Sequence, residues 1–299
     1  MKLLLNSNLA LKAALAIATF FLTATPSEAG VIYVSNAQAN SIVSFDLDSG
    51  LSNGFFTTDG LSYPVGLALN SAGNLFVGNY PTGQILQFNP AGTSLGIFAT
   101  IGANGPSGSA FDSFGNLFLS DEDHNSIWKY TPDGTGILFA STGMNGPIGL
   151  AFDAAGFLYV ANSNSNLILK FTRGGVSSPF ASTGSHPRGM AFGSSGNLFV
   201  ANSGDNTIQQ FASDGSGSVF ASTHLSGPQE IAFDSSGNLF AANFGDNTLA
   251  KFTSDGTGTI FANTGLAGPW GIAIASVPEP QGIALLFVAG ATLILRRRR

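Results

Sequence analysis

The feature that most constrains this chain is a unit of about 41 residues that recurs along it. A proline before a short apolar run marks the start of each copy, and successive prolines are 42, 41, 40, 41 and 41 residues apart. These prolines are Pro64, Pro106, Pro147, Pro187, Pro228 and Pro269. A fixed period of this length indicates a repeat architecture, in which each unit buries its apolar face against its neighbours.

Each copy contains four short segments that are typical of β-strands. In one copy they read "GPIGLAF", "GFLYVAN", "LILKF" and "SPFA", and Gly, Pro, Asn or Asp bounds each of them. The composition agrees, because 39 glycines, 26 phenylalanines and only 9% charged residues disfavour helices and favour strands joined by tight turns. Four strands in about 41 residues are typical of one propeller blade.

The two ends of the repeat predict how the ring closes. "VIYVSN" (Val31–Asn36) is a second segment with no first, and "GPWGIAIAS" (Gly268–Ser276) is a first segment with no second. The sequence therefore predicts an all-β, six-bladed β-propeller with four-stranded blades. Its C-terminal innermost strand pairs with the N-terminal strand, which leaves no open seam. A parallel β-helix is the alternative fold, but it would not need this matched deficit.

The N-terminal residues 1–29 predict a secretory signal peptide. Lys2 and Lys12 precede or flank the apolar run "AALAIATFFLTA", and small residues stand at Ser27 and Ala29. Cleavage is expected after Ala29. The alternative, a buried helix, has no helical partner in the rest of the chain. The propeller is then assigned to residues 30–276.

The C-terminal residues 277–299 predict a membrane segment that follows the propeller. Ile283–Leu295 is apolar and Arg296–Arg299 is basic. This apolar run is short against the roughly 20 residues of a full span. The arginines are expected to stay on the cytoplasmic side, which places the propeller across the membrane.

Charge and cysteine content exclude two classes of function. Residues 30–277 carry 15 Asp and Glu against 5 Lys and Arg, which gives a net charge near −10 (5 − 15). An acidic body of this kind offers no electrostatic footprint for nucleic acid. The chain has no cysteine, so it can form neither a disulfide nor a thiolate metal site.

The unit "GPxGxAFDxxGNLFVAN…DNTIxxF" resembles the NHL repeat, a six-bladed propeller family, over residues 31–276. It is also similar to a broader group of exported propellers that includes gluconolactonase-like and streptogramin-lyase-like proteins. These resemblances imply the propeller fold expected above. They leave open whether the protein is an enzyme or a binding protein, because propellers serve both functions.

The tail resembles a PEP-CTERM sorting signal, which combines a PEP motif, an apolar segment and a basic end. The motif here is Pro278, Glu279 and Pro280. The resemblance implies a Gram-negative bacterium, processing by signal peptidase and exosortase, and transient insertion in the inner membrane. The protein is then expected to cross the inner membrane and to reach the cell surface, outer membrane or extracellular matrix after C-terminal processing.

Departures from the repeat identify a candidate ligand site. Loops between second and third strands, and between fourth and first strands, are expected on one propeller face around the axial channel. The candidate ligand-binding residues there are Tyr80, Asp121, His124, Asn162, His186, Arg188, Asn202, Gln229, Glu230, Asn243, Phe244 and Trp270. Aromatic platforms with planar polar groups suit a sugar or another small polar ligand.

A structural interpretation of the same residues stays open. The repeated Asn and Asp residues can serve turn conformation alone. Arg188 and Glu230, on adjacent blades, can pair with each other, and the aromatic residues can simply fill the channel.

An enzymatic site is the alternative to simple binding. Metal-dependent lactonases of the related propellers place Asn and Asp directly after the equivalent proline. Here those positions hold Val65, Ser107, Ile148, Arg188, Gln229 and Trp270. We therefore predict a non-enzymatic binding or scaffold protein without catalytic residues, metal or cofactor, whose partner is a polysaccharide or a surface protein.

The competing hypothesis is a metal-dependent lactonase or lyase at the same mouth. It would use Glu230, Asp121 and either His124 or His186, because a lyase needs a positioned acid or base. It also expects a divalent cation such as Ca²⁺ in the central channel.

Overall fold

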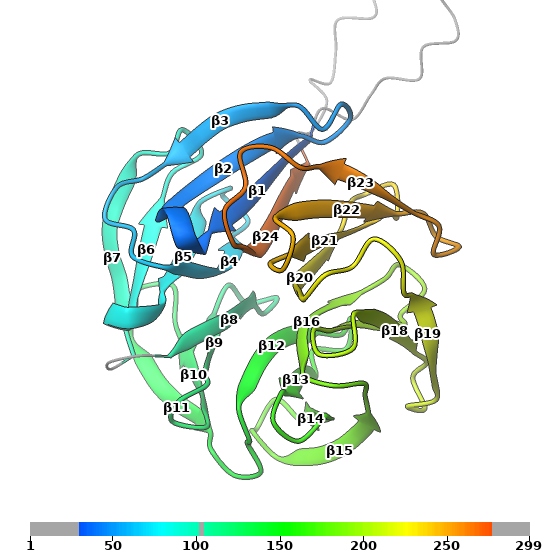
Figure 1. The fold of residues 1–299 in the computed structure, drawn as a ribbon. Helices are drawn as coiled ribbons and strands as arrows, with labels where there is room; N and C mark the ends of the chain where they lie inside the picture. The colour runs from blue at the N-terminus through cyan, green and yellow to red at the C-terminus, as the bar shows by residue number, and fades with distance from the viewer. Residues whose placement is uncertain (1–29, 102–104, 277–299) are drawn as a thin grey trace, which may run out of the picture. The chain divides into compact units, whose positions relative to one another are not determined.

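The computed structural model describes residues 30–101 and 105–276, which form six four-stranded antiparallel sheets. Figure 1 shows these sheets arranged in a ring, with β4, β8, β12, β16, β20 and β24 innermost. The six-bladed propeller predicted from the repeat is thereby confirmed. The predicted signal helix and transmembrane helix lie outside the described residues. Within the described part, no helix has the length and apolar character needed to cross a membrane.

The blades are numbered here in chain order. The first contains β24 (Pro269–Ser276), β1 (Gly30–Asn36), β2 (Ser41–Asp46) and β3 (Ser52–Thr57), with the 3-10 turn η1 (Ala37–Ala39). The second contains β4 (Pro64–Leu69), β5 (Leu75–Asn79), β6 (Gln84–Phe88) and β7 (Ser94–Thr100), with η2 (Tyr80–Thr82). The third contains β8 (Pro106–Phe111), β9 (Leu117–Asp121), β10 (Ser126–Tyr130) and β11 (Gly136–Ala140).

The remaining three blades follow the same order. The fourth contains β12 (Pro147–Phe152), β13 (Leu158–Asn162), β14 (Leu167–Phe171) and β15 (Ser177–Ser182). The fifth contains β16 (Pro187–Phe192), β17 (Leu198–Asn202), β18 (Thr207–Phe211) and β19 (Gly217–Ala221). The sixth contains β20 (Pro228–Phe233), β21 (Leu239–Asn243), β22 (Thr248–Phe252) and β23 (Gly258–Ala262).

The ring closes through the first blade, as the matched ends of the repeat predict. β24 pairs antiparallel with β1, and its register places Ile32 opposite Ile274 and Tyr33 opposite Ala273. The last strand of the repeat therefore covers the edge that the first strand would otherwise leave unpaired.

Aromatic residues fill the spaces between neighbouring blades. Phe199 of β17 meets Phe220 with ring centroids 4.9 Å apart and Phe233 with centroids 5.0 Å apart, both edge to face. The same arrangement recurs around Phe76, Phe118 and Tyr159. Each edge-to-face pair contributes about 0.5–1.5 kcal/mol beyond its buried area, so the repeated Phe is a packing residue.

The second residue after each repeated proline is glycine because neighbouring inner strands approach closely there. A Cβ on Gly149 would lie 1.9 Å from the Arg188 carbonyl oxygen of the next blade. A Cβ on Gly108 would lie 2.0 Å from the Ile148 oxygen. Only the sixth blade departs from this rule, and it carries Glu230.

Candidate functional site at the channel mouth

Two sets of loops meet on one face of the ring. The Tyr80 N–H donates to the Tyr63 oxygen at 3.4 Å, and the Ser203 N–H donates to the His186 oxygen at 3.0 Å. Equivalent bonds join the β1–β2, β9–β10, β13–β14 and β21–β22 loops to the segments before the prolines. These backbone bonds hold the two sets of loops together around the axis of the ring. We call the surface that they form the channel mouth.

The asparagines that end the second strands hold this loop framework. Asn243 is buried, its Oδ1 accepts from the Ser226 N–H at 3.3 Å and its Nδ2 donates to the His224 oxygen at 2.8 Å. Asn162 makes the corresponding bonds to the Asn145 N–H and the Gly143 oxygen. The side chains of both residues are therefore engaged by the protein's own backbone, as a role in turn conformation requires.

Asn202 differs from the other two candidate asparagines. Its Nδ2 donates to the Thr207 hydroxyl and to Gln209, both at 3.1 Å. Its Oδ1 is buried and has no hydrogen-bond partner. The four matching asparagines of other blades have partners for both amide atoms, so the unpaired Asn202 Oδ1 is a departure from the pattern.

A bulge at the start of every inner strand sets the direction of the residues after the prolines. The pairing of β16 with β17 shifts register between Pro187 and Met190, and the pairing of β20 with β21 shifts between Pro228 and Glu230. The four other inner strands shift at the matching place. Bulges of this kind re-aim side chains and recur beside binding sites.

Arg188 is the cationic group of the mouth. Its guanidinium carbon lies 5.1 Å from the Trp270 ring centroid, and its Nε donates to the Ser203 hydroxyl at 3.1 Å. Its Nη1 is buried without a hydrogen-bond partner. Burial lowers the pKa of Arg188, and the Glu122 carboxylate opposes that shift, so the guanidinium stays charged at neutral pH.

Aromatic rings border Arg188 on one side. Trp270 meets Tyr63 with ring centroids 6.2 Å apart and Phe244 with centroids 5.7 Å apart. Tyr63 in turn lies 6.4 Å from Tyr80, whose hydroxyl is 3.3 Å from the Asp123 carboxylate. Burial, followed by the Asp123 charge, raises the pKa of Tyr80 to about 12, so its hydroxyl remains a donor.

Gln229 occupies the position that matches Arg188 on the adjacent inner strand. Its Nε2 donates to the Gly227 oxygen at 2.8 Å, while its Oε1 is buried without a partner. A buried acceptor left unpaired costs about 1–3 kcal/mol, so such atoms mark places where a ligand or water completes the bonding. Arg188 and Gln229 thus present one unpaired donor and one unpaired acceptor from neighbouring strands.

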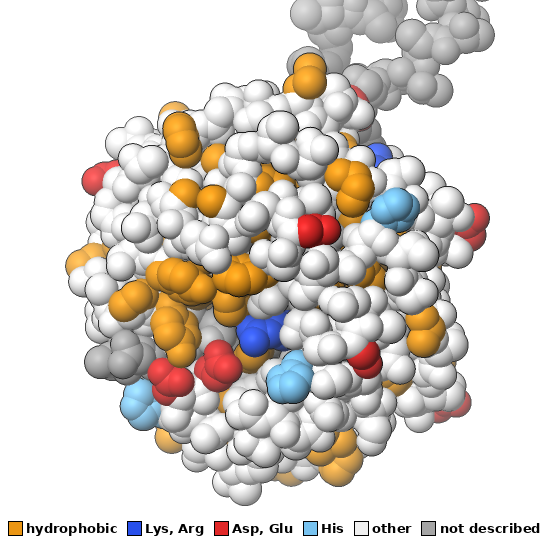
Figure 2. Space-filling model, in the orientation of Figure 1, with side chains coloured by type: hydrophobic (Ala, Val, Ile, Leu, Met, Phe, Trp, Pro, Cys, Tyr) orange, Lys and Arg blue, Asp and Glu red, His pale blue; other side chains and the backbone are white. Residues whose placement is uncertain are grey.

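Acidic residues and histidines lie on other parts of the same face. The Glu122 Oε2 accepts from the Ser107 hydroxyl at 3.0 Å. The Asp121 carboxylate lies 2.9 Å from Nδ1 of His124, whose side chain is 60% exposed. His186 has a φ of 54° and its Nδ1 lies 2.9 Å from the Ser185 hydroxyl. Figure 2 shows hydrophobic, basic and acidic side chains meeting near the middle of this face.

Glu230 lies in the inner wall and does not pair with Arg188. Its carboxylate accepts from the Ile231 N–H at 3.2 Å and from the Met190 N–H of the adjacent blade. Burial raises the pKa of Glu230 to about 8 against the pull of these two bonds. The suggestion that Glu230 and Arg188 neutralise each other is therefore wrong, because the Arg188 guanidinium lies over the Trp270 ring and the Glu230 carboxylate bonds to backbone N–H groups.

The arrangement lacks the donor set of a metal centre. Across residues 30–101 and 105–276, no group of three or more His, Asp or Glu side chains is placed to hold a metal ion. Glu230 bonds to backbone N–H groups, and Asp121 bonds to His124, so the carboxylates expected to share a cation have separate partners. These residues do not fit the channel cation of the enzymatic alternative.

Two members of the site were not among the residues singled out from the sequence. Tyr63 joins Tyr80 to Trp270, and the negative charge of Glu122 acts to raise the pKa of Arg188. A signal for Tyr63 was present, because it stands directly before Pro64, where four of the six copies carry glycine. Comparing the residues after each proline missed a departure that lies before it.

The fold and this mouth define a six-bladed propeller with a polar and aromatic site at one end of its axial channel. A sequence profile of the virginiamycin B lyase family matches residues 55–278, about three quarters of the chain. The chain therefore belongs to the virginiamycin B lyase family. This match is consistent with the NHL-like propeller and with the streptogramin-lyase-like resemblance that the repeat indicated. No curated protein sequence matches the chain.

Solved structures with the same fold have diverse activities. A streptogramin B lyase is 20% identical with a TM-score of 0.65, covering 81% of this chain and 83% of its own. A chain of the nidogen/laminin complex is 19% identical with a TM-score of 0.74, and the match covers 82% of this chain and 98% of that one. A gluconolactonase from Xanthomonas campestris is 19% identical with a TM-score of 0.61, and the match covers 68% of this chain and 77% of the gluconolactonase. At this identity the likeness establishes the fold alone.

Proposed function

We propose that this protein binds a small carbohydrate ligand at the channel mouth without converting it. The observation that carries the proposal is the pair of buried, unpaired atoms on adjacent inner strands, Arg188 Nη1 and Gln229 Oε1. Native proteins rarely leave such atoms without partners, and a bound ligand provides the partners.

The chemistry of the pair suits a hydroxylated ring. A sugar hydroxyl accepts and donates at once, so neighbouring hydroxyls can accept from Arg188 and donate to Gln229. The rings of Trp270, Tyr63 and Tyr80 offer apolar surface to the C–H face of a pyranose, as rings in carbohydrate-sized sites do. The residues after the six prolines include a single ionisable side chain, Arg188, which supports binding over catalysis.

The test is a glycan array with the purified protein and two mouth variants. Arg188→Met keeps an unbranched side chain of similar length and removes the donors that lie over Trp270, and Gln229→Leu removes the acceptor. Loss of a charged hydrogen bond should weaken binding of the best glycan by about 10-fold or more. Lys251→Gln, on another part of the propeller, is the control and should bind as the unmodified protein does.

The proposal fails if no glycan binds, or if Arg188→Met binds the best glycan as tightly as the unmodified protein. Binding without any change in the glycan's mass after prolonged incubation supports the non-enzymatic part. A cleaved or ring-opened product would contradict that part.

A lyase or lactonase is the second candidate, and family membership together with one contact favours it. The matched family is that of virginiamycin B lyase, and His124 has its Nδ1 held at 2.9 Å by the buried Asp121 carboxylate. This bond leaves Nε2 available as a proton acceptor on an exposed ring.

The second candidate predicts turnover of quinupristin, the compound in a solved structure of virginiamycin B lyase, or of gluconolactone, and mass spectrometry would detect the product. Turnover should be lost in His124→Gln and reduced in Asp121→Asn, and Lys251→Gln should leave it unchanged. Absence of product from both compounds removes this candidate for these substrates.

We further propose that the propeller is exported and sorted by its ends. The motifs at Ser27–Ala29 and at Pro278, Glu279 and Pro280 support cleavage by signal peptidase and by exosortase. Intact-mass measurement of the surface protein should show loss of residues 1–29 and of the chain beyond the PEP motif. Retention of Arg299 on a membrane-held form contradicts the proposal, and Glu279→Ala should accumulate that form.

A further inference from the structure

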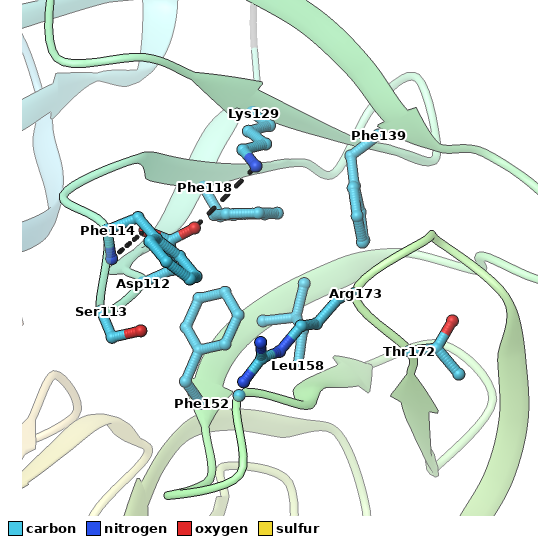
Figure 3. Close-up of a pocket in the computed structure, with 11 residues that line it drawn as sticks. Asp112, Ser113, Phe114, Phe118, Lys129, Phe139, Phe152, Leu158, Thr172 and Arg173 are labelled. Atoms are coloured by element: carbon cyan, nitrogen blue, oxygen red, sulfur yellow. Dashed lines mark hydrogen bonds and ion pairs between the residues drawn. The ribbon is translucent and has the colours of Figure 1, made fainter.

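The loops opposite the mouth form a cavity between the third and fourth blades that the mouth does not use. Its volume is about 70 Å³. Phe118, Phe139 and Phe152 line its interior, and Phe114 stands at its entrance with 70% of its surface exposed. Figure 3 shows Lys129 and Arg173 approaching these rings from two sides. We call this cavity the third-blade groove.

Two cations are held beside the aromatic rings by specific contacts. The Lys129 Nζ lies 5.4 Å from the Phe118 ring centroid. The Arg173 guanidinium lies 5.9 Å from the Phe114 ring centroid, and its Nη2 donates to the Ala155 oxygen at 2.8 Å. Arg173 of the fourth blade thus reaches Phe114 of the third and joins the two sides of the groove.

One carboxylate lies in the groove, and its charge is already compensated. The Asp112 Oδ1 accepts from the N–H groups of Phe114 and Asn116, both at 2.9 Å, and Oδ2 accepts from the Asn116 amide at 2.8 Å. Lys129 lies 3.9 Å from the same carboxylate. Two cations against one bonded carboxylate leave the groove positive.

The propeller contains a second copy of this groove, between the fifth and sixth blades, that serves as an internal comparison. The same positions provide its aromatic lining: Phe199, Phe220 and Phe233. At the three variable positions, Ser195 replaces Phe114, Gln210 replaces Lys129 and Ser254 replaces Arg173. That groove has a volume of about 310 Å³ and no cation among its lining residues.

The two grooves differ at these three positions and in their carboxylates, because Asp112 of the third-blade groove is replaced by Gly193 and Asp234 lines only the other groove. Phe114 stands where other copies carry Ala72, Ala155, Ser195 and Ser236. Phe114 extends the apolar lining of the cavity to the surface and lies next to the Arg173 guanidinium. The propeller has only five Lys and Arg between residues 30 and 276, and two of them flank this one groove.

We propose that the third-blade groove binds a small hydrophobic carboxylic acid. The apolar group lies among the four phenylalanines, and the carboxylate accepts from Lys129 and Arg173 at the rim. A volume of about 70 Å³ exceeds the roughly 30 Å³ of one water and takes the branched end of a short acid. The propeller as a whole is acidic, but Lys129 and Arg173 lie together at this groove. Their positive charge favours binding of an anion beside the aromatic rings. The proposal does not depend on the function of the mouth.

The experiment measures binding of isovalerate and phenylacetate to the purified protein by saturation-transfer NMR and titration. Their uncharged amides, isovaleramide and phenylacetamide, are the matched ligands. We expect each acid to bind about 5-fold or more tightly than its amide, since two rim cations each contribute up to about a 5-fold effect.

The variants borrow residues from the groove between the fifth and sixth blades, which folds with them. Lys129→Gln and Arg173→Ser should each remove the preference for the acid, and Phe114→Ser should weaken acid and amide alike. Lys251→Gln is the matched control, because Lys251 occupies the position of Lys129 on the sixth blade. It should bind both acids as the unmodified protein does.

A gain-of-function variant makes the test independent of lost stability. Ser195→Phe, Gln210→Lys and Ser254→Arg together rebuild the charged groove between the fifth and sixth blades and should add a second binding site. The proposal is overturned if acid and amide bind equally, if neither acid binds at 10 mM, or if Lys251→Gln loses as much binding as Lys129→Gln.

Discussion

Glu230 should make the free energy of unfolding depend on pH, because its carboxyl is buried in the inner wall of the channel. Five blades carry glycine at this place, so the inner wall offers little solvent to a longer side chain. Burial raises the pKa of Glu230 from 4.5 to about 8. The folded protein therefore holds a proton on Glu230 across a pH range in which the unfolded chain has released it. Glu230→Gln keeps the shape of the protonated side chain and removes its titration.

The sign and size of the effect follow from this shift. Because the folded pKa is raised, the stabilisation is fully present below pH 4.5 and is lost as pH rises through about 8. One pKa unit corresponds to about 1.4 kcal/mol, so the shift from 4.5 to about 8 corresponds to a difference on the order of 5 kcal/mol. Glu230→Gln should match the unmodified protein near pH 4 and exceed its stability by that order at pH 9.

The assay is urea unfolding of both proteins from pH 4 to pH 9, compared as a difference. Other carboxyl groups are shared by the two proteins, so their titrations cancel in the difference. Glu230→Gly, which restores the residue of the other blades, should show the same pH dependence as Glu230→Gln. Two free-energy curves that run parallel from pH 5 to pH 9 would refute the burial of this carboxyl.

Three further substitutions test the framework around the channel, each by urea unfolding. Gly149→Ala should destabilise by about 3 kcal/mol or more, because its Cβ would meet the Arg188 oxygen at 1.9 Å, whereas exposed Gly196→Ala should cost less. Asn243→Ala should cost about 1–3 kcal/mol, because it leaves the Ser226 N–H and the His224 oxygen unpaired; a cost below 0.5 kcal/mol contradicts this. Phe252→Ala should cost about 3–5 kcal/mol as a buried aromatic, and a change under 1 kcal/mol would contradict its place in the core.

Most of the fold could be predicted because the same pattern of four strands and their turns recurs in six copies. Each proline marks an inner strand, each Asn or Asp closes a second strand, and the unmatched ends of the chain state the ring closure. The glycine that stands two residues after five of the six prolines could also be noted in the sequence. Its cause is the backbone of the neighbouring blade, which would lie 1.9–2.9 Å from a Cβ at these glycines, and this distance between blades is not visible in the sequence.

The location of the site could be predicted from the sequence, but the contacts between its side chains could not. The loop face and the departures at Arg188, Gln229 and Trp270 could be located from the repeat. The direction of Arg188 could not, because a bulge at the start of β16 decides where its side chain points. The same limit applies to Glu230, which sequence placed near Arg188 and which instead bonds to backbone of its own and the adjacent strand.

The third-blade groove shows a different reason for a missed feature. Phe114 and Arg173 lie in loops of different blades, and neither loop stands beside a repeated proline. Comparing one blade with the next reveals each as a departure, yet their contact depends on the packing of neighbouring blades. Such a site becomes visible only when matching grooves are compared in space.

The most direct test of the channel mouth is a crystal structure of the protein soaked with the tightest glycan from the array. We predict a sugar ring against Trp270, with hydroxyls within hydrogen-bond distance of Arg188 Nη1 and Gln229 Oε1. A glycan bound at any other surface, with only water at these two atoms, would contradict it.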